Sequence, residues 1–95
     1  MSKNCVYSLL KKVPKGKVTT YKELAKACGL HPRVVGMLMR INQDPENIPC
    51  YKVIHSDGRV GGYSKGVEKK IELLKKDGIE IKNSRINLKK YLFKF

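Results

Sequence analysis

The chain has 95 residues, 41% of them hydrophobic, which is enough for one compact domain and too little for two independent ones. Lysine and arginine number 21 against 8 acidic residues, so the formal net charge is +13. Repulsion among these positive charges disfavours a compact folded state unless a bound polyanion offsets it. Nucleic acid is therefore the first partner to consider. We expect a single domain over residues 1–95, acting as a cytoplasmic monomer.

Several classes of protein are disfavoured by what the sequence lacks. No apolar run approaches the roughly 20 residues that span a bilayer, so no membrane partner is expected, and the N-terminal segment lacks the apolar core of a signal peptide. The cysteines at 5, 28 and 50 are widely spaced and form no Cys-x-x-Cys pair, and only His31 and His55 could join them as metal ligands. The sequence therefore favours neither a disulfide framework nor a zinc site, and no cofactor is expected.

Apolar residues recur at helical spacing in three consecutive segments, which predicts helices over residues 5–13, 20–28 and 31–42. Thr20 and Glu23 form a capping box at the start of the second segment, and Gly29 ends it. Pro32 suits the first position of the third helix, where a missing N–H has no cost. Three residues join the last two helices, as in a helix-turn-helix, although an ordinary helical hairpin would give the same pattern.

The second half of the chain predicts a small β-hairpin and a further helix. Pro49 holds the end of a polar loop extended, which places Cys50 directly after that loop and off the helices. Residues 52–60 have the form of a short hairpin around Asp57-Gly58, and residues 67–78 have helical spacing. Residues 79–95 form a basic tail, expected to pack back as a strand and a turn. These elements predict a mainly α, winged-helix-like DNA-binding domain with a helix-turn-helix and a small β-hairpin.

The segment Ile-Pro-Cys-Tyr-Lys-Val-Ile at 48–54 resembles the Pro-Cys-His-Arg-Val signature of the O6-alkylguanine-DNA alkyltransferases. Residues 16–25 resemble that family's entry into the helix-turn-helix, and Arg-Val-Val-Gly at 33–36 resembles its recognition helix. Asn42 stands eight residues before Cys50, like the family's structural asparagine, and residues 61–64 resemble its Gly-x-Tyr-Ser loop. The resemblance covers roughly residues 14–80. It implies the family's C-terminal active-site and DNA-binding domain, without the N-terminal domain that members commonly carry.

What the resemblance implies is a methylated-DNA–protein-cysteine S-methyltransferase that acts once. The thiolate of Cys50 would displace guanine from the alkyl carbon on O6 and keep the alkyl group as a thioether. Thiolates are strong nucleophiles in electropositive surroundings, to which Lys52 and the basic field would contribute. The alternative for Cys50 is a buried structural cysteine, and this is how we interpret Cys5 and Cys28, which lie on apolar helix faces.

The same resemblance assigns residues that would hold an extruded base. Tyr21 would offer its phenol to the guanine ring and Ser64 a loop donor to O6, because guanine leaves only if its growing charge is met by donors. An apolar slot would form around the base from four side chains, namely Met39, Val53, Val60 and Tyr63. Plain core packing is the alternative for these four, above all for the two valines.

The resemblance also implies a DNA-binding surface on the third helix, with double-stranded DNA containing O6-alkylguanine as partner. Arg33 would fill the gap left in the duplex, and Gly36 would let the helix lie close to the backbone. Tyr21 and Lys52 would add DNA contacts. The family places this helix in the minor groove, so little sequence readout is expected. A solvated surface charge is the alternative for Arg33.

The sequence departs from the family pattern next to the nucleophile. Tyr51 stands where most members have a histidine that relays a proton through water toward a glutamate, and Asp77 stands at the glutamate position. A phenol is a poor base near neutral pH, which predicts slow or more pH-dependent thiolate formation at Cys50. His55 could act as a substitute base, but an odd separation along a strand would point it to the opposite face from Cys50.

Two other functions remain open from the sequence. Alkyltransferase-like proteins bind and flip alkylated guanine without a cysteine nucleophile; Cys50 argues against this non-enzymatic sensor, whereas Tyr51 favours it. A winged-helix regulator that reads operator DNA in the major groove would leave the segment around Cys50 and the loop at 61–64 unexplained.

Overall fold

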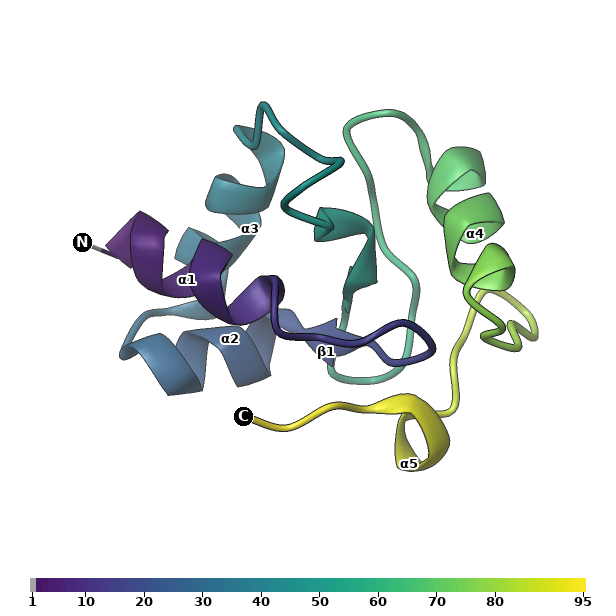
Figure 1. Ribbon diagram of the computed structural model, residues 1–95. Coiled ribbons are helices and arrows are strands. Elements are labelled where there is room, and N and C mark those ends of the chain that lie inside the picture. The colour runs from purple at the N-terminus through teal and green to yellow at the C-terminus, as the bar shows by residue number, and fades with distance from the viewer. Residues whose placement is uncertain (1) are drawn as a thin grey trace.

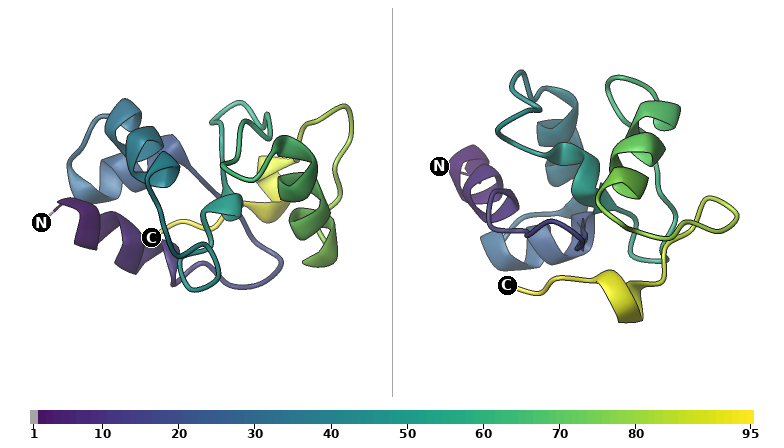
Figure 2. Two further views of the ribbon diagram at one scale, coloured as in Figure 1. Left: turned by 90° about the horizontal axis from the view of Figure 1, so that it is seen from above. Right: turned by 45° about the vertical axis from the view of Figure 1, so that its right-hand side comes forward.

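A computed structural model describes residues 2–95 as a mostly helical domain with a two-stranded sheet (Figure 1). In chain order the elements are α1 (Ser2–Leu10), β1 (Thr19–Thr20), α2 (Tyr21–Cys28), α3 (Pro32–Arg40), the 3₁₀ helix η1 (Cys50–Lys52), β2 (Val53–Ile54), α4 (Val67–Lys76) and α5 (Leu88–Tyr91). Helices α1, α2 and α3 gather on one side of β2, and α4 lies on the other (Figures 1 and 2). None of the helices within residues 2–95 is long and apolar enough to cross a bilayer.

The predicted helix-turn-helix forms, and its ends are capped as the sequence indicates. The hydroxyl of Thr20 accepts a hydrogen bond from the backbone N–H of Glu23 at 3.0 Å, and Gly29 ends α2 in the left-handed conformation with φ 67°. The imidazole Nδ1 of His31 accepts from the N–H of Arg33 at 3.0 Å, which fixes the start of α3. Helix α3 ends at Arg40 rather than at Asn42, because the asparagine side chain bonds to the following loop instead.

Two apolar clusters flank the small sheet. The first joins α1, α2 and α3, and the second lies between the sheet, α4 and the C-terminal segment. Val53 belongs to the first cluster and Ile54 to the second, because successive residues of a strand point to opposite faces. The phenol of Tyr7 donates to the backbone oxygen of Leu38 at 2.7 Å and so fastens α1 to α3. Strand β2, which directly follows the 3₁₀ helix η1 that begins at Cys50, therefore lies between both cores.

The predicted hairpin over residues 52–60 is wrong in its strand pairing. Its tight turn forms, since the N–H of Gly58 donates to the backbone oxygen of His55 at 3.0 Å. However, β2 pairs in parallel with β1, in the register Thr19 to Val53 and Thr20 to Ile54. After the turn the chain leaves β2, and the N–H of Val60 donates to Ser84 at 3.0 Å. Local sequence shows the turn, whereas a non-local partner decides the pairing.

The tail packs back onto the domain, with a short helix that the sequence did not predict. Residues 82–85 form the expected turn, and α5 follows, where Asn87 accepts from the N–H of Lys89 at 3.0 Å. Beyond α5 the chain runs beside Val18, whose N–H donates to Tyr91 at 2.9 Å and whose oxygen accepts from Phe93 at 2.8 Å. An isolated parallel bridge between Val18 and Leu92, rather than a regular strand, forms here.

The prediction that the cysteines form no disulfide is wrong for Cys5 and Cys28, which are bonded to each other and are only partly buried. The bond joins α1 to the last residue of α2, with the two Cα atoms 6.0 Å apart. Each cysteine lies on the apolar face of its own helix, and the sequence does not reveal that the two helices meet at these positions. The crosslink joins residues that are 23 positions apart in the chain and ties α1 to the first helix of the helix-turn-helix.

We expect reduction of this disulfide to lower the free energy of unfolding by about 3 kcal/mol, because the crosslink restricts a loop of this size in the unfolded chain. Urea unfolding with and without a reductant measures the effect. The double variant Cys5→Ser/Cys28→Ser is the control and should not respond to the reductant. Equal stability of the wild-type protein under both conditions would show that the two thiols are not paired.

Candidate active site

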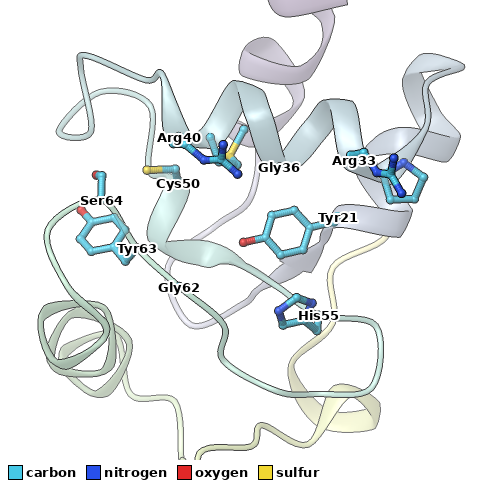
Figure 3. A pocket seen from close by; sticks show the side chains of 11 residues that line it. Tyr21, Arg33, Gly36, Arg40, Cys50, His55, Gly62, Tyr63 and Ser64 are labelled. Carbon is cyan, nitrogen blue, oxygen red and sulfur yellow. The ribbon is translucent and has the colours of Figure 1, made fainter.

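A pocket of about 620 Å³ opens between α3 and the loop that contains Gly62, Tyr63 and Ser64 (Figure 3). Its volume lies in the range of roughly 300–1,000 Å³ that is typical of small-molecule sites. Cys50 lies toward one end, whereas Tyr21 and His55 lie toward the other (Figure 3). Within residues 2–95 no three His, Cys, Asp or Glu side chains gather as metal ligands would.

Cys50 is positioned by the loop that precedes it. The side-chain amide of Asn42 donates to the backbone oxygen of Ile48 at 2.8 Å, and its oxygen accepts from the N–H of Asp44 at 3.0 Å. This asparagine is buried and bridges the two ends of the loop, the structural part that the family resemblance assigns to it. The prediction that Cys50 lies off the helices is wrong, because it is the first residue of the 3₁₀ turn η1.

The thiol of Cys50 is free, and only 5% of the residue is exposed. Its sulfur points toward the side of the pocket that holds Tyr63 and Ser64 (Figure 3). Such a position combines limited contact with solvent and direct contact with the cavity. The arrangement favours a reactive thiol over a purely structural one, because a structural cysteine would be enclosed by apolar side chains alone.

Tyr21 and His55 meet at the far end of the pocket because β1 and β2 are parallel. Each residue directly follows its strand, and their ring centroids are 5.3 Å apart. The prediction that His55 faces away from the Cys50 side is wrong, since both residues line the same pocket. The parity argument fails because η1 interrupts the extended backbone between them. His55 is nonetheless seen beside Tyr21 rather than beside the sulfur (Figure 3).

Helix α3 contributes one wall of the pocket through residues three or four positions apart. Met39 lines it as predicted, and Arg33 and Gly36, which the sequence assigned to the DNA-binding surface, line it too. Val35 and Leu38 on the opposite side are buried in the core. Arg40 also lines the pocket and was not singled out from the sequence, although it lies one turn beyond Gly36 on the same face. The exposed guanidinium groups of Arg33 and Arg40 thus lie along this wall, on either side of Gly36 in the helix.

The facing wall holds the phenol of Tyr63 and the hydroxyl of Ser64, both of which the sequence predicts for this site. Burial raises the pKa of Tyr63, and negative charge at Cys50 raises it further. Burial and then the charge of Cys50 raise the pKa of Tyr21 in the same way. Both phenols therefore keep their protons near neutral pH and can donate hydrogen bonds into the cavity.

Tyr51 and Asp77 are brought together as the family pattern implies. The phenol of Tyr51 donates to Oδ2 of Asp77 at 2.6 Å, across 26 positions of the chain. Burial raises the pKa of Tyr51 well above its ordinary value, and the hydrogen bond to Asp77 adds to the shift. Tyr51 is not among the residues that line the pocket, and it packs against the second apolar cluster. The pair links η1 to the end of α4 and does not face the cavity.

Three predicted site residues lie elsewhere in the fold. Lys52 is 7% exposed, and its ammonium donates to the backbone oxygen of Val13 at 2.8 Å, so the prediction that it contacts DNA is wrong. The prediction that Val53 and Val60 line the base slot is also wrong: they are 0% and 1% exposed and pack in the first and second cluster respectively. Core packing was the alternative that the sequence left open for both valines.

Lys70 of α4 is the residue that sequence reasoning missed. It is 0% exposed, and its ammonium donates to the backbone oxygen of Val53 at 2.7 Å and of Gly62 at 3.1 Å. Burial lowers the pKa of Lys70 from 10.5 to about 8, while negative charge at Cys50 acts in the opposite direction. A cation at Lys70 and a thiolate at Cys50 therefore stabilise each other. In the sequence this lysine is one of many in a basic helix, and nothing distinguishes it.

We expect Lys70 to make the free energy of unfolding rise with pH above about pH 8. Between its folded pKa of about 8 and the ordinary value of 10.5, the unfolded chain binds a proton that the folded chain has released. Stability then increases with pH, by at most about 1.4 kcal/mol per pH unit. Urea unfolding of wild type and Lys70→Met over this range measures the difference.

The control is Lys69→Met, which removes the exposed neighbouring lysine and should keep the wild-type pH dependence. If Lys70→Met also keeps the wild-type slope, the lysine is not the group responsible.

The chain matches the sequence profile of the family described as 6-O-methylguanine DNA methyltransferase, DNA binding domain, over residues 2–79. A bifunctional methyltransferase/endonuclease of Picrophilus torridus is 56% identical over 90 residues, which are 93% of this chain and 30% of that protein. The methylated-DNA–protein-cysteine methyltransferase of Saccharolobus solfataricus is 45% identical over 76 residues, which are 80% of this chain and 50% of that protein. The chain thus spans half or less of the length of these relatives.

Two solved structures show the same fold. The O6-methylguanine-DNA methyltransferase of Pyrococcus kodakaraensis superposes with a TM-score of 0.75 and 44% identity, over 81% of this chain and 46% of that one. Atl1 of Schizosaccharomyces pombe, solved in complex with damaged DNA containing O6-carboxymethylguanine, superposes with a TM-score of 0.88 and 27% identity, over 99% and 95%. From its profile match and the agreement of its fold, the chain belongs to the 6-O-methylguanine DNA methyltransferase family.

Proposed function

We propose that the protein repairs DNA by direct reversal, accepting a methyl or alkyl group from O6-alkylguanine onto Cys50 in a single, irreversible turnover. The observation that carries this proposal is a free thiol in the wall of a cavity large enough for a purine. The chain then corresponds to the part of the family's proteins that carries the nucleophile. Membership of a DNA methyltransferase family and the names of its relatives support this reading.

The transfer is a displacement at the alkyl carbon. The sulfur of Cys50 forms the new bond to that carbon, the carbon–O6 bond breaks, and its electron pair goes to the guanine, which takes up one proton. Tyr21 and Ser64 supply donors from opposite sides of the cavity, where the charge develops on the base. Tyr63 and Met39 supply flat and apolar surfaces that hold the ring.

DNA would approach along the exposed side of α3, from which the cavity opens. Arg33 and Arg40 flank Gly36 there, so two cations border a position where no side chain obstructs the backbone. With the helix in the minor groove, Arg33 would occupy the space that the flipped nucleotide leaves. Nothing lies within 4 Å of the position of a Cβ at Gly36, which is consistent with its use as a contact surface for an outside partner.

The non-enzymatic sensor remains the second candidate, because Atl1 matches the fold over almost all of both chains. That agreement includes residues 80–95, which lie beyond the profile match. In this alternative the protein binds alkylated guanine in the same cavity, and Cys50 does not react. Both candidates use the same DNA-binding surface, so only the fate of the alkyl group separates them.

Incubation with a duplex that contains O6-methylguanine is expected to add one methyl group to the protein, because Cys50 borders the cavity that receives the base. Intact-protein mass spectrometry measures the gain, and peptide mapping places it on the cysteine. Cys50→Ala, which binds the same duplex, is the control and should gain nothing. Tight binding of the lesion by the wild-type protein without any gain in mass would favour the sensor.

Replacing Tyr51 by histidine is expected to speed transfer near neutral pH by roughly tenfold or more. The phenol of Tyr51 holds its proton too strongly to act as a base, whereas an imidazole oriented by Asp77 can accept one. Single-turnover rates against pH measure the change. Tyr51→Phe is the control and should react nearly as fast as wild type, so a large loss in that variant would contradict the passive role of the phenol.

A further inference from the structure

A second pocket, of about 500 Å³, adjoins the first one. His55 and Gly62 line both, so the two cavities share a wall. Gly61 keeps this wall thin, because a Cβ at this position, where φ is 77°, would lie 2.9 Å from the imidazole of His55. Arg59 and Arg85 line the far side of the second pocket.

These two arginines are placed directly opposite each other. Arg59 and Arg85 form an isolated antiparallel bridge, and like charges in such a position destabilise the folded chain. The carboxylate of Asp57 bonds to only one of them: its Oδ2 pairs with Nε of Arg59 at 2.8 Å, whereas Arg85 donates to the backbone oxygen of Asp57 at 3.2 Å. The pocket therefore carries a surplus of positive charge that the protein itself does not neutralise.

The backbone that presents Arg85 is held in a tight two-residue turn. Asn83 and Ser84 have φ of 52° and 59°, in the left-handed region that residues other than glycine rarely adopt. The turn is closed by hydrogen bonds between Lys82 and Arg85 at 3.0 and 2.9 Å, and Ser84 accepts from Val60 at 3.0 Å. The closed turn thus holds Arg85 beside Arg59 against the repulsion of their like charges.

We propose that this second pocket is a phosphate subsite, which holds a backbone phosphate of the DNA beside the nucleotide that enters the first pocket. Guanidinium groups pair with phosphate through two parallel hydrogen bonds, and a phosphate between Arg59 and Arg85 would relieve their repulsion. The shared wall places this phosphate next to the cavity for the base. Such a position is required if the phosphate and the base belong to neighbouring parts of one DNA strand. The inference rests on the proposed function only in taking DNA as the source of the phosphate.

The salt dependence of affinity for an unmodified duplex tests the subsite. Each phosphate neutralised contributes about −0.9 to the slope of log affinity against log salt concentration. Arg85→Gln is expected to make the slope shallower by about this amount and to weaken binding. Lys89→Gln, which removes an exposed charge from α5 outside the pocket, is the matched control and should keep a slope closer to wild type. An unchanged slope in Arg85→Gln, or an equal loss in both variants, overturns the proposal.

Two further measurements separate charge from folding and DNA from free phosphate. Arg85→Lys keeps the charge and is expected to retain the wild-type slope, and thermal unfolding of each variant confirms that it is folded. Inorganic phosphate, titrated into the DNA-free protein, should shift the amide resonances of Gly61 and Ser84 in wild type but not in Arg85→Gln. Shifts of this kind together with an unchanged DNA slope would mean that the pocket takes free phosphate, which overturns its assignment to DNA.

The failure of this inference can be told apart from failure of the proposed function. Methyl transfer is scored by protein mass and the subsite by binding to undamaged DNA. Suppose that the wild-type protein gains no methyl group, while the slope of log affinity against log salt is still shallower in Arg85→Gln. This result contradicts the transfer to Cys50 and supports the subsite.

Discussion

The buried ammonium of Lys70 holds together the parts from which the pocket is built. It hydrogen-bonds to the backbone of β2 through Val53 and to the glycine-rich loop through Gly62, so that one side chain of α4 fixes two segments. These segments carry the facing groups of the cavity, since Cys50 begins η1, which directly precedes β2, and Tyr63 directly follows Gly62. Desolvating this cation is costly, and its carbonyl partners and any negative charge at Cys50 offset that cost.

The parallel pairing of β1 and β2 provides the second constraint. Because α2 begins directly after β1, the register of two residue pairs places the first residue of α2, Tyr21, beside the first residue after β2, His55. The same pairing separates the two apolar clusters, so the helix-turn-helix and α4 each pack on their own side of β2. A sheet of only two short strands thereby decides which residues from distant parts of the chain meet in the cavity.

The sequence predicts well what depends on neighbouring residues. The cap at Thr20, the end of α2 at Gly29 and the start of α3 at Pro32 are local signals, and the structure confirms them. Contacts between distant segments are not encoded in local spacing, and this explains why the disulfide of Cys5, the strand partner of β2 and the acceptors of Lys70 were not foreseen. The family resemblance supplied the distant pairing that spacing could not, as with Tyr51 and Asp77.

Predictions for single residues made without regard to the backbone were less reliable, whether they came from the resemblance or from strand alternation. Lys52 follows the nucleophile by two positions and suggests a charged surface, but the 3₁₀ turn directs it inward to Val13. The same turn brings His55 onto the side of the pocket that strand alternation excludes. A departure from regular extended backbone at Cys50 therefore accounts for both errors, because face assignments along a strand hold only while the strand is continuous.

The central claim is that Cys50 meets the alkyl carbon of a guanine turned out of the duplex into the first pocket. A crystal structure of the Cys50→Ser variant bound to an O6-methylguanine duplex tests it most directly. The account predicts the modified base between Tyr63 and Met39, with its methyl carbon toward the serine hydroxyl and Arg33 in the gap left in the duplex. A modified base still stacked within the helix, with an empty cavity beside residue 50, would contradict the account.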